Sequence, residues 1–118
     1  MDISIYFQPS ERFGNSRPEW LANTIGDNGT FHTGKGFPSL EGARIALFGV
    51  CDDPGHARPR SCVHAPDAIR NELYQLYLPA GDLRIVDLGD IHPGASAGDT
   101  QHAVADTIAE LMRMNIVP

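Results

Sequence analysis

The chain has 118 residues, at most one domain by length, and its 42% hydrophobic and 20% charged content is ordinary for a folded globular protein. A net charge of −6 with a single lysine argues against a nucleic-acid-binding surface, which needs clustered Lys and Arg side chains. The sequence has no long apolar run that predicts a membrane span and no secretory signal at its start. Cys51 and Cys62 are too few for a disulfide framework, so we expect a cytoplasmic protein with reduced thiols.

Residues 1–42 show no clear periodicity, and we interpret them as an N-terminal extension wrapped against a core. Alternating apolar residues allow a short edge strand near the start, formed by Ile3, Ile5 and Phe7 and limited by Pro9. A helix of about two turns is expected over residues 16–25, and the glycines of residues 26–29 would end it.

Residues 43–118 alternate between strand and helix patterns. In chain order, the expected elements are a buried strand over residues 44–50, a helix over 66–77, a strand over 83–90, a helix over 100–114 and the start of a third strand at Ile116 and Val117. This order predicts an α/β protein with a parallel sheet and right-handed crossovers. Strands of this kind would leave open sheet edges on their own, so we expect the sequence to be a piece of a larger α/β protein.

Each of the two longer helices has an apolar stripe that is expected to face the sheet. The stripe of the first helix consists of Ile69, Leu73, Leu76 and Tyr77. The stripe of the second consists of Val104, Ile108, Leu111, Met112 and Asn115. Asp99 is the expected N-cap of the second helix, and Gly49 in the first strand is expected to let a neighbouring segment approach closely.

The loop after the first strand holds polar residues that could carry chemistry. Asp52 and Asp53 could bind a metal or accept a phosphoryl group, although a solvated turn is the favoured interpretation. Arg58 and Arg60 could face a carboxylate substrate or a partner subunit, or lie in solvent. Two cysteines and two histidines in this loop suggest a zinc site: Cys51, His56, Cys62 and His64. They lack the closely spaced ligand pairs of structural zinc sites, so we favour the interpretation that they are loop residues near a cleft.

Asp87 and Asp90 flank a Leu-Gly pair in the second strand. An acid at a strand end can bind a ribose hydroxyl, but the chain lacks the glycine-rich turn of dinucleotide-binding folds. Asp90 is therefore expected to cap or orient the following loop. His92 is expected at the surface, and His102, in the first turn of the last helix, is expected to have no switch role.

Four segments occur in an order and spacing that resemble the N-terminal part of the ureohydrolase superfamily, which contains arginase, agmatinase and formimidoylglutamase. These segments are residues 45–50, a loop with Gly55, Arg58 and Arg60, residues 65–70, and residues 86–90. The resemblance covers about two thirds of the chain, from Glu41 to Pro118. Ala65 departs from the family pattern, which usually has glycine at that position.

The resemblance implies a three-layer α/β/α, arginase-like fold with a mostly parallel sheet, of which residues 43–118 are the first β/α units. It also implies hydrolysis of guanidino or formimino C–N bonds with a pair of manganese ions. The family's metal-binding segments, Gly-Gly-Asp-His, Asp-Ala-His-x-Asp and Asp-x-Asp, do not occur here. We therefore assign no catalytic, cofactor-binding or metal-binding residue, and we expect these residues alone to be inactive.

The sequence thus predicts the N-terminal part of a manganese-dependent hydrolase of linear amidines. Its expected partners are a small amidine or guanidine substrate and further copies of itself in a homo-oligomer, with neither nucleic acid nor membrane. The alternative is a small self-associating α/β module without catalysis, in which strand edges and apolar helix faces pair between copies. A receiver or nucleotide-binding domain fits the pattern poorly.

Overall fold

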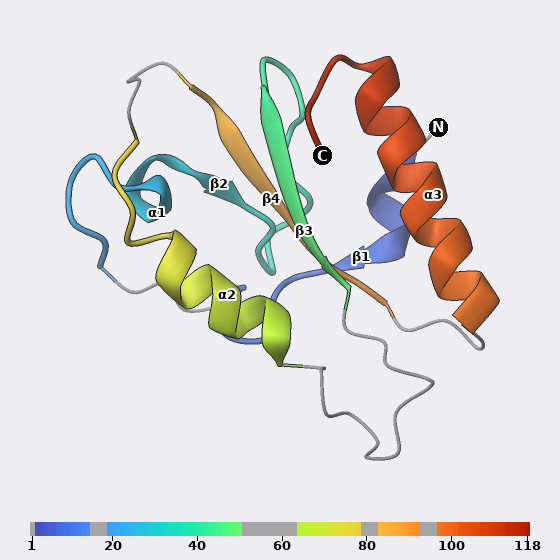
Figure 1. The fold of residues 1–118 in the computed structure, drawn as a ribbon, viewed down its shortest axis with the longest axis horizontal. Coiled ribbons are helices and arrows are strands. Elements are labelled where there is room, and N and C mark those ends of the chain that lie inside the picture. Colours follow the sequence, from blue (N-terminus) through green and yellow to red (C-terminus); the bar gives the residue numbers. More distant parts are fainter. Residues whose placement is uncertain (1, 15–18, 51–63, 79–82, 93–96) are drawn as a thin grey trace.

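The computed structural model describes residues 2–14, 19–50, 64–78, 83–92 and 97–118 (Figure 1). Within these residues the protein is a compact α/β fold with a mixed sheet of four strands. The elements in chain order are η1 (Ile3–Tyr6), β1 (Phe7–Gln8), α1 (Ile25–Asn28), β2 (Thr30–Phe31), β3 (Ile45–Val50), α2 (Ala65–Leu73), β4 (Ile85–Ile91) and α3 (Ala97–Arg113). None of the described helices combines the length and apolar character that crossing a membrane requires.

Strand β4 is the centre of the sheet, and all seven of its residues are buried. It pairs in parallel with β3 along one edge; along its other edge it pairs in parallel with β2 and antiparallel with β1. The expectation of a parallel sheet is therefore correct for three strands and wrong for β1. The N-terminal segment adds this antiparallel strand directly to the end of β4, with Phe7 opposite Ile91.

The N-terminal elements are shorter than the sequence predicts. Ile3 and Ile5 lie in the 3-10 turn η1, because the Asp2 side chain accepts a hydrogen bond from Ser4 N at 3.0 Å and caps that turn, so only β1 is extended. The helix predicted over residues 16–25 is wrong for described residues 19–24. The chain is instead helical only over α1, because the Thr24 side chain accepts a hydrogen bond from Asp27 N at 3.2 Å and starts a helix there.

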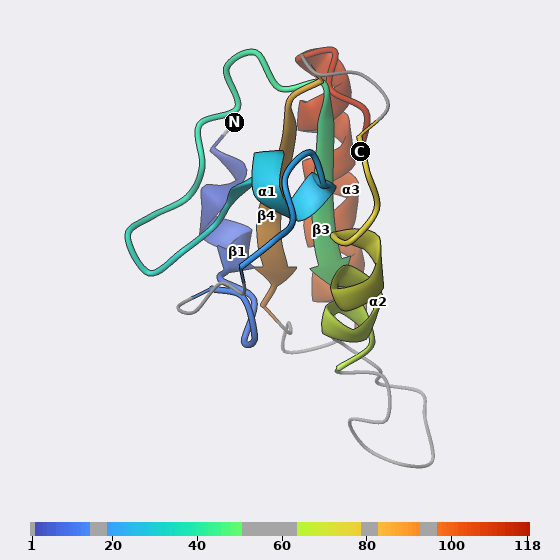
Figure 2. The same ribbon diagram turned by 90° about the vertical axis from the view of Figure 1, so that its left-hand side faces the viewer.

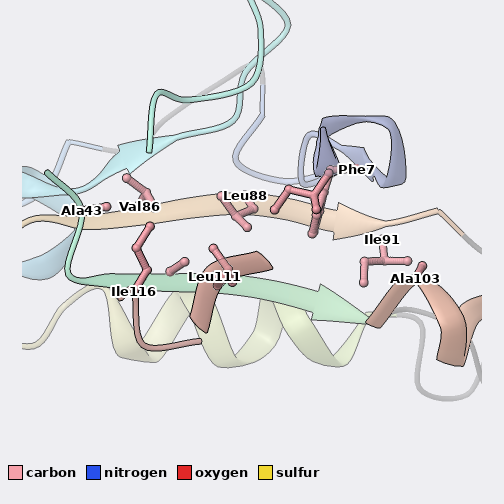
Figure 3. Packing of buried hydrophobic residues seen from close by; sticks show 10 residues of the cluster. Phe7, Ala43, Val86, Leu88, Ile91, Ala103, Leu111 and Ile116 are labelled. Atoms are coloured by element: carbon pink, nitrogen blue, oxygen red, sulfur yellow. The ribbon is translucent and has the colours of Figure 1, made fainter. Parts of the chain in front are cut away.

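One face of the sheet packs on α3. The hydrophobic core there combines one residue of β3 and three residues of β4 with residues from other parts of the chain: Ile3, Phe7, Ala43, Ala46, Val86, Leu88, Ile91, Ala103, Leu111 and Ile116 (Figure 3). Helix α3 begins earlier than predicted, which places Asp99 in its first turn rather than at the N-cap. Met112, predicted to face inward, is 64% exposed.

Asn115 is also exposed, contrary to prediction, and its φ of +60° marks the turn after α3. Val104 and Ile108 are partly buried, whereas Ala103, Thr107 and Leu111 form the buried line of the helix at its 3.6-residue period. The inner face is therefore rotated from the predicted one, and small or polar residues fill part of it.

Helix α2 lies on the opposite face of the sheet (Figure 2). It ends at Leu73 rather than at residue 77. Its predicted inward stripe is wrong for three of its four residues, because Ile69, Leu76 and Tyr77 are more than half exposed. The fourth, Leu73, is partly buried. The buried residues of this segment are Arg70 and Tyr74, which face acidic side chains of β4.

The third strand predicted at Ile116 and Val117 is present as a single parallel bridge between Val117 and Ile45. Val117 N donates to Arg44 O and Val117 O accepts from Ala46 N, both at 2.9 Å. This pairing lies on the edge of β3 that faces away from β4. Strand β3 was expected to be buried on both faces, but it is only partly buried, because its outer edge is covered only near its start by described residues.

Candidate functional site

A bulge in β4 turns two carboxylates toward the same helix. Residues three apart in a regular strand point to opposite faces of the sheet. Here Leu47 pairs with Asp87 and Gly49 with Asp90, so β4 contains one more residue than β3 between these pairs. Gly89, with a φ of +87°, provides the conformation that this extra residue requires. Asp87 and Asp90 therefore both face α2.

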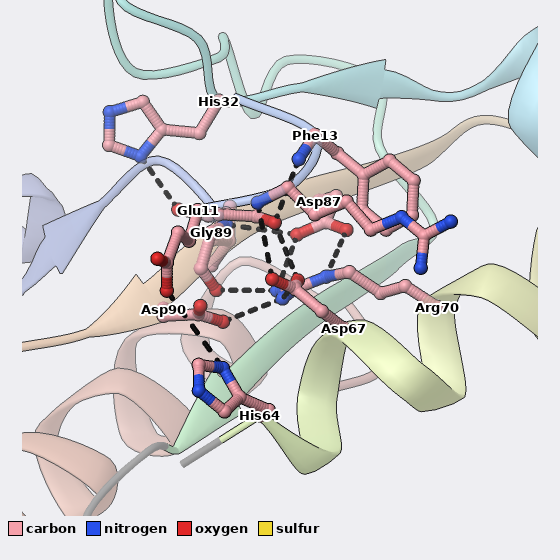
Figure 4. A network of polar contacts seen from close by, with 12 residues as sticks. Glu11, Phe13, His32, His64, Asp67, Arg70, Asp87, Gly89 and Asp90 are labelled. Atoms are coloured by element: carbon pink, nitrogen blue, oxygen red, sulfur yellow. Dashed lines mark hydrogen bonds and ion pairs between the residues drawn. The ribbon is translucent and has the colours of Figure 1, made fainter. Parts of the chain in front are cut away.

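Arg70 of α2 binds both of these carboxylates (Figure 4). Its Nε and Nη2 atoms donate to the two oxygens of Asp87 at 2.9 and 3.1 Å. Its Nη1 atom donates to Asp90 Oδ1 at 2.7 Å and to Asp67 Oδ1 at 3.0 Å, and Nη2 also donates to Gly89 O at 2.9 Å. All five guanidinium N–H groups thus have an acceptor, and the side chain is only 5% exposed.

Residues from the N-terminal segment and from α2 complete the network. Ser10 Oγ donates to Asp67 Oδ1 at 2.5 Å, and Arg12 N donates to Asp67 Oδ2 at 3.2 Å. The Tyr74 hydroxyl donates to Asp87. His32 Nδ1 donates to Leu88 O at 2.8 Å, next to the bulge (Figure 4). The network therefore connects residues that are far apart in the sequence.

The charges of the network are unequal, because three carboxylates surround one guanidinium. Burial raises the pKa of the Asp87 carboxyl above its usual range, while Arg70 acts in the opposite direction. Burial alone would lower the pKa of Arg70, but Asp87 and Asp90 together raise it above its ordinary value. Arg70 is consequently a permanent cation that makes the burial of these acids tolerable.

Gly49 allows the network to form beside β3. A Cβ atom at this position would overlap Asp90 Oδ1 and would lie 2.7 Å from Pro66 Cβ. The sequence prediction that Gly49 lets a neighbouring segment approach closely is confirmed. The neighbours are the side chain of Asp90 and the first turn of α2.

A pocket of about 350 Å³ lies next to the network, between β3 and α2. Its lining is mostly apolar and includes Leu47, Phe48, Val50, Pro66, Ile69 and Leu73. Arg70 also borders this pocket, but its donors are already used within the network. The described residues therefore offer apolar contact in this pocket rather than a free cationic group.

The acids of the network do not form a metal site. Among the described residues, no group of three or more His, Cys, Asp or Glu side chains could hold a metal ion. Asp67, Asp87 and Asp90 direct oxygens to Arg70 instead. The arrangement is suited to joining α2 to the carboxyl end of β4.

Most of the predicted loop candidates lie outside the described residues: Cys51, Asp52, Asp53, His56, Arg58, Arg60 and Cys62. His64, the fourth residue of the zinc hypothesis, is exposed and lies 3.9 Å from Glu11. His92 is exposed, as predicted. His102 lies past the first turn of α3, because that helix starts at Ala97, and its ring is 3.3 Å from Asp106.

The structure adds partners for both acids of β4. Asp90 Oδ1 binds Arg70, and most of the loop that Asp90 was expected to cap or orient, residues 93–96, lies outside the described residues. Asp87 is buried against Arg70 and Tyr74, which does not suit the exposed ribose-binding acid of a dinucleotide fold. Sequence reasoning gave no role to Tyr74 and noted Arg70 only as part of a resembling segment. Two acids within an otherwise apolar strand could have indicated a buried cationic partner.

Comparisons of the chain with protein-family models, with curated proteins and with solved structures found no match. The class that the described residues define is an α/β fold with a buried Arg–Asp network at the carboxyl end of its central strand.

Proposed function

We propose that residues 43–118 are the first β/α units of an arginase-like hydrolase that cleaves a C–N bond of a linear amidine or guanidine. The observation that most strongly supports this proposal is that three of the four segments that resemble the ureohydrolase family meet at one network. Arg70, from residues 65–70, binds Asp87 and Asp90, from residues 86–90, and Asp90 packs on Gly49, from residues 45–50. The residues that carry the resemblance are thus the ones that connect the elements.

The three-layer α/β/α arrangement of the family is part of this proposal. Helices α2 and α3 on opposite faces of the sheet agree with it, as does the parallel pairing of β3 with β4. Residues 1–42 act as an extension that adds β1 and β2 to the sheet.

Manganese would belong to the complete enzyme and not to the residues described here. A pair of manganese ions there would supply an activated water as the nucleophile and would stabilise the charge that develops during hydrolysis. The acids of the network do not fit that role, because they bind Arg70. Their contribution is to hold the carboxyl ends of β3 and β4 in place, where open parallel sheets bind ligands. We place the enzyme in the cytoplasm.

The experiment is a hydrolysis assay on the complete product of the gene and on the 118-residue chain. Both are given arginine, agmatine and formimidoylglutamate with manganese, and the release of urea or formamide is measured. We expect the complete product to hydrolyse one of these compounds, chelation to abolish turnover, and the 118-residue chain to show none. Turnover by the shorter chain, or no hydrolysis by the complete product, would contradict the proposal.

Self-association is a second candidate function, favoured by the exposed stripe on α2. Ile69 is 64% exposed and lies beside an apolar pocket, so its burial between copies would be favourable. We expect dimers or larger species in sedimentation experiments, and Ile69→Glu should shift them to monomers. Met112→Glu is the matched control, because Met112 has the same exposed fraction, 64%, but lies on α3 on the opposite face of the sheet. A wild-type chain that stays monomeric at high concentration excludes this candidate.

A further inference from the structure

Asn28 and Gly29 form the only Asn-Gly pair in the sequence. Asparagine is a thermolabile residue, and a following glycine has no side chain to hinder attack by its backbone nitrogen on the asparagine amide. The pair lies at the end of α1 and directly before β2 (Figure 1). Asn28 is exposed, so the pair is both chemically labile and accessible to water.

The reaction open to this pair is deamidation in two steps. Gly29 N loses its proton and attacks Asn28 Cγ, and the bond between Cγ and Nδ2 breaks as ammonia leaves. The product is a five-membered cyclic imide. Water then opens either of the two ring C–N bonds that join a carbonyl carbon to the nitrogen, which gives aspartate or isoaspartate. In the net reaction one water is consumed and one ammonia is released.

The fold opposes the first of these steps. Gly29 N donates to Ile25 O at 2.8 Å, so its proton is held in a hydrogen bond. Asn28 Nδ2 donates to Thr24 O at 3.0 Å, one turn back along the helix, which keeps the side-chain amide away from Gly29 N. Both bonds exist only while α1 is helical. Ring closure therefore requires α1 to open.

Helix α1 is a single turn with little stability of its own. The buried Thr24 side chain caps it by accepting a hydrogen bond from Asp27 N at 3.2 Å. The first two N–H groups of α1 donate to Leu76 O and Tyr74 O, at 2.8 and 2.9 Å. The turn is thus kept closed by its cap and by the segment that follows α2.

An isoaspartate at this position would misplace β2. It routes the main chain through the side chain and so adds one carbon atom immediately before the strand. In the unmodified chain Thr30 pairs with Val86, and His32 N then donates to Asp87 O at 2.9 Å. A longer main chain cannot keep both α1 and this register, so we expect β2 to separate from β4.

We propose that Asn28 is a site of spontaneous deamidation controlled by α1: the closed turn protects the amide, and isoaspartate formed after the turn opens prevents β2 from pairing with β4. Loss of ammonia makes the change irreversible, so the modified fraction increases with the time that α1 has spent open. The proposal goes beyond the proposed hydrolysis and does not depend on it.

The test is incubation of the 118-residue chain at mildly alkaline pH, with deamidation of Asn28 followed by peptide mass spectrometry. A peptide of residues 23–33 is the unfolded reference, and we expect the folded chain to react at least about tenfold more slowly. Thr24→Ala removes the cap and should raise the rate about fivefold, whereas Thr24→Ser keeps the hydroxyl and the slow rate. Thr33→Ala is the matched control, because it removes a similar bond, from Lys35 N at 3.2 Å, outside α1.

Urea below the unfolding transition provides a second measurement that does not require Thr24→Ala to fold, and it should raise the rate toward that of the peptide. In the isoaspartate form the His32 amide should exchange at least about tenfold faster, because it loses Asp87 O. The Arg44 amide, which donates to Arg84 O at 2.9 Å, is the internal control. Three results would overturn the proposal: a folded chain that reacts as fast as the peptide, a rate that neither Thr24→Ala nor urea raises, or unchanged His32 exchange in the isoaspartate form.

Discussion

Replacing Arg70 by methionine is expected to lower the free energy of unfolding by about 3–5 kcal/mol, because it leaves buried carboxylates without their cation. Asp87 and Asp90 are each 4% exposed, so water cannot replace the guanidinium. A domain of this size is stable by about 5–15 kcal/mol, and the change would remove a large part of that margin. Urea unfolding followed by the fluorescence of Trp20, which packs against Tyr74 in an aromatic cluster, measures the effect.

Arg113→Met is the matched control, because Arg113 pairs with Glu110 while its side chain is 67% exposed. Its expected loss is much smaller than that of Arg70→Met, because solvent screens an exposed ion pair. Tyr74→Phe removes only the hydroxyl that donates to Asp87, and its expected loss is about 1–2 kcal/mol, so it tests the network even where Arg70→Met fails to fold. Equal losses for Arg70→Met and Arg113→Met would contradict a buried network.

The free energy of unfolding that Arg70→Met removes should also depend on pH. A carboxyl whose pKa is raised on folding contributes stability at low pH and loses that contribution as the pH rises through its folded pKa. Burial raises the pKa of Asp87, and Arg70 opposes that rise, so Arg70→Met should raise the pKa further. Because protonation removes the charge that Arg70 neutralises, the free energy of unfolding lost in Arg70→Met is expected to be smaller at about pH 4 than at about pH 7.

The second large effect is expected for Gly89→Ala, with a loss of about 2–4 kcal/mol from a strained φ and a steric overlap. Gly89 has a φ of +87°, and a Cβ atom there would overlap the backbone oxygen of Gln8 in β1. The substitution should displace β1 and turn Asp90 away from Arg70. Thermal and urea unfolding measure the loss.

The substitution Gly42→Ala separates the conformational cost of a positive φ from the cost of steric overlap. Gly42 has a similar φ of +75°, but the nearest atom to its Cβ position is Arg84 Nη1 at 4.0 Å. Its expected loss is therefore only the conformational cost, about 1–2 kcal/mol. Equal losses at Gly42 and Gly89 would mean that contact with β1 does not constrain the bulge.

Apolar runs bounded by turn residues were sufficient to predict β3, β4 and the approximate positions of α2 and α3. The inner face of α2 could not be predicted in the same way. An apolar stripe indicates the buried face only where the facing surface is apolar, and β4 presents Asp87 and Asp90 to this helix. Burial of Arg70 depends on those two residues, which come from a distant part of the sequence.

The bulge in β4 shows a second limit of prediction from the sequence. Gly89 within a strand is a signal for a bulge, but strict alternation places Asp87 and Asp90 on opposite faces. Only the pairing with Leu47 and Gly49 reveals that both carboxylates face α2. The short N-terminal strands were predicted only in part for a similar reason. An edge strand was expected before Pro9, where β1 lies, but β2 was not predicted, since β1 and β2 have two residues each and are defined by their pairing with β4.

The central claim is that Arg70 is a buried cation whose five N–H groups are all bonded, and NMR of its guanidinium group tests it most directly. We predict separate Nη proton signals with hindered rotation and slow exchange with water, in contrast to the exposed Arg113. A single averaged signal for Arg70 that exchanges as rapidly as that of Arg113 would contradict the account.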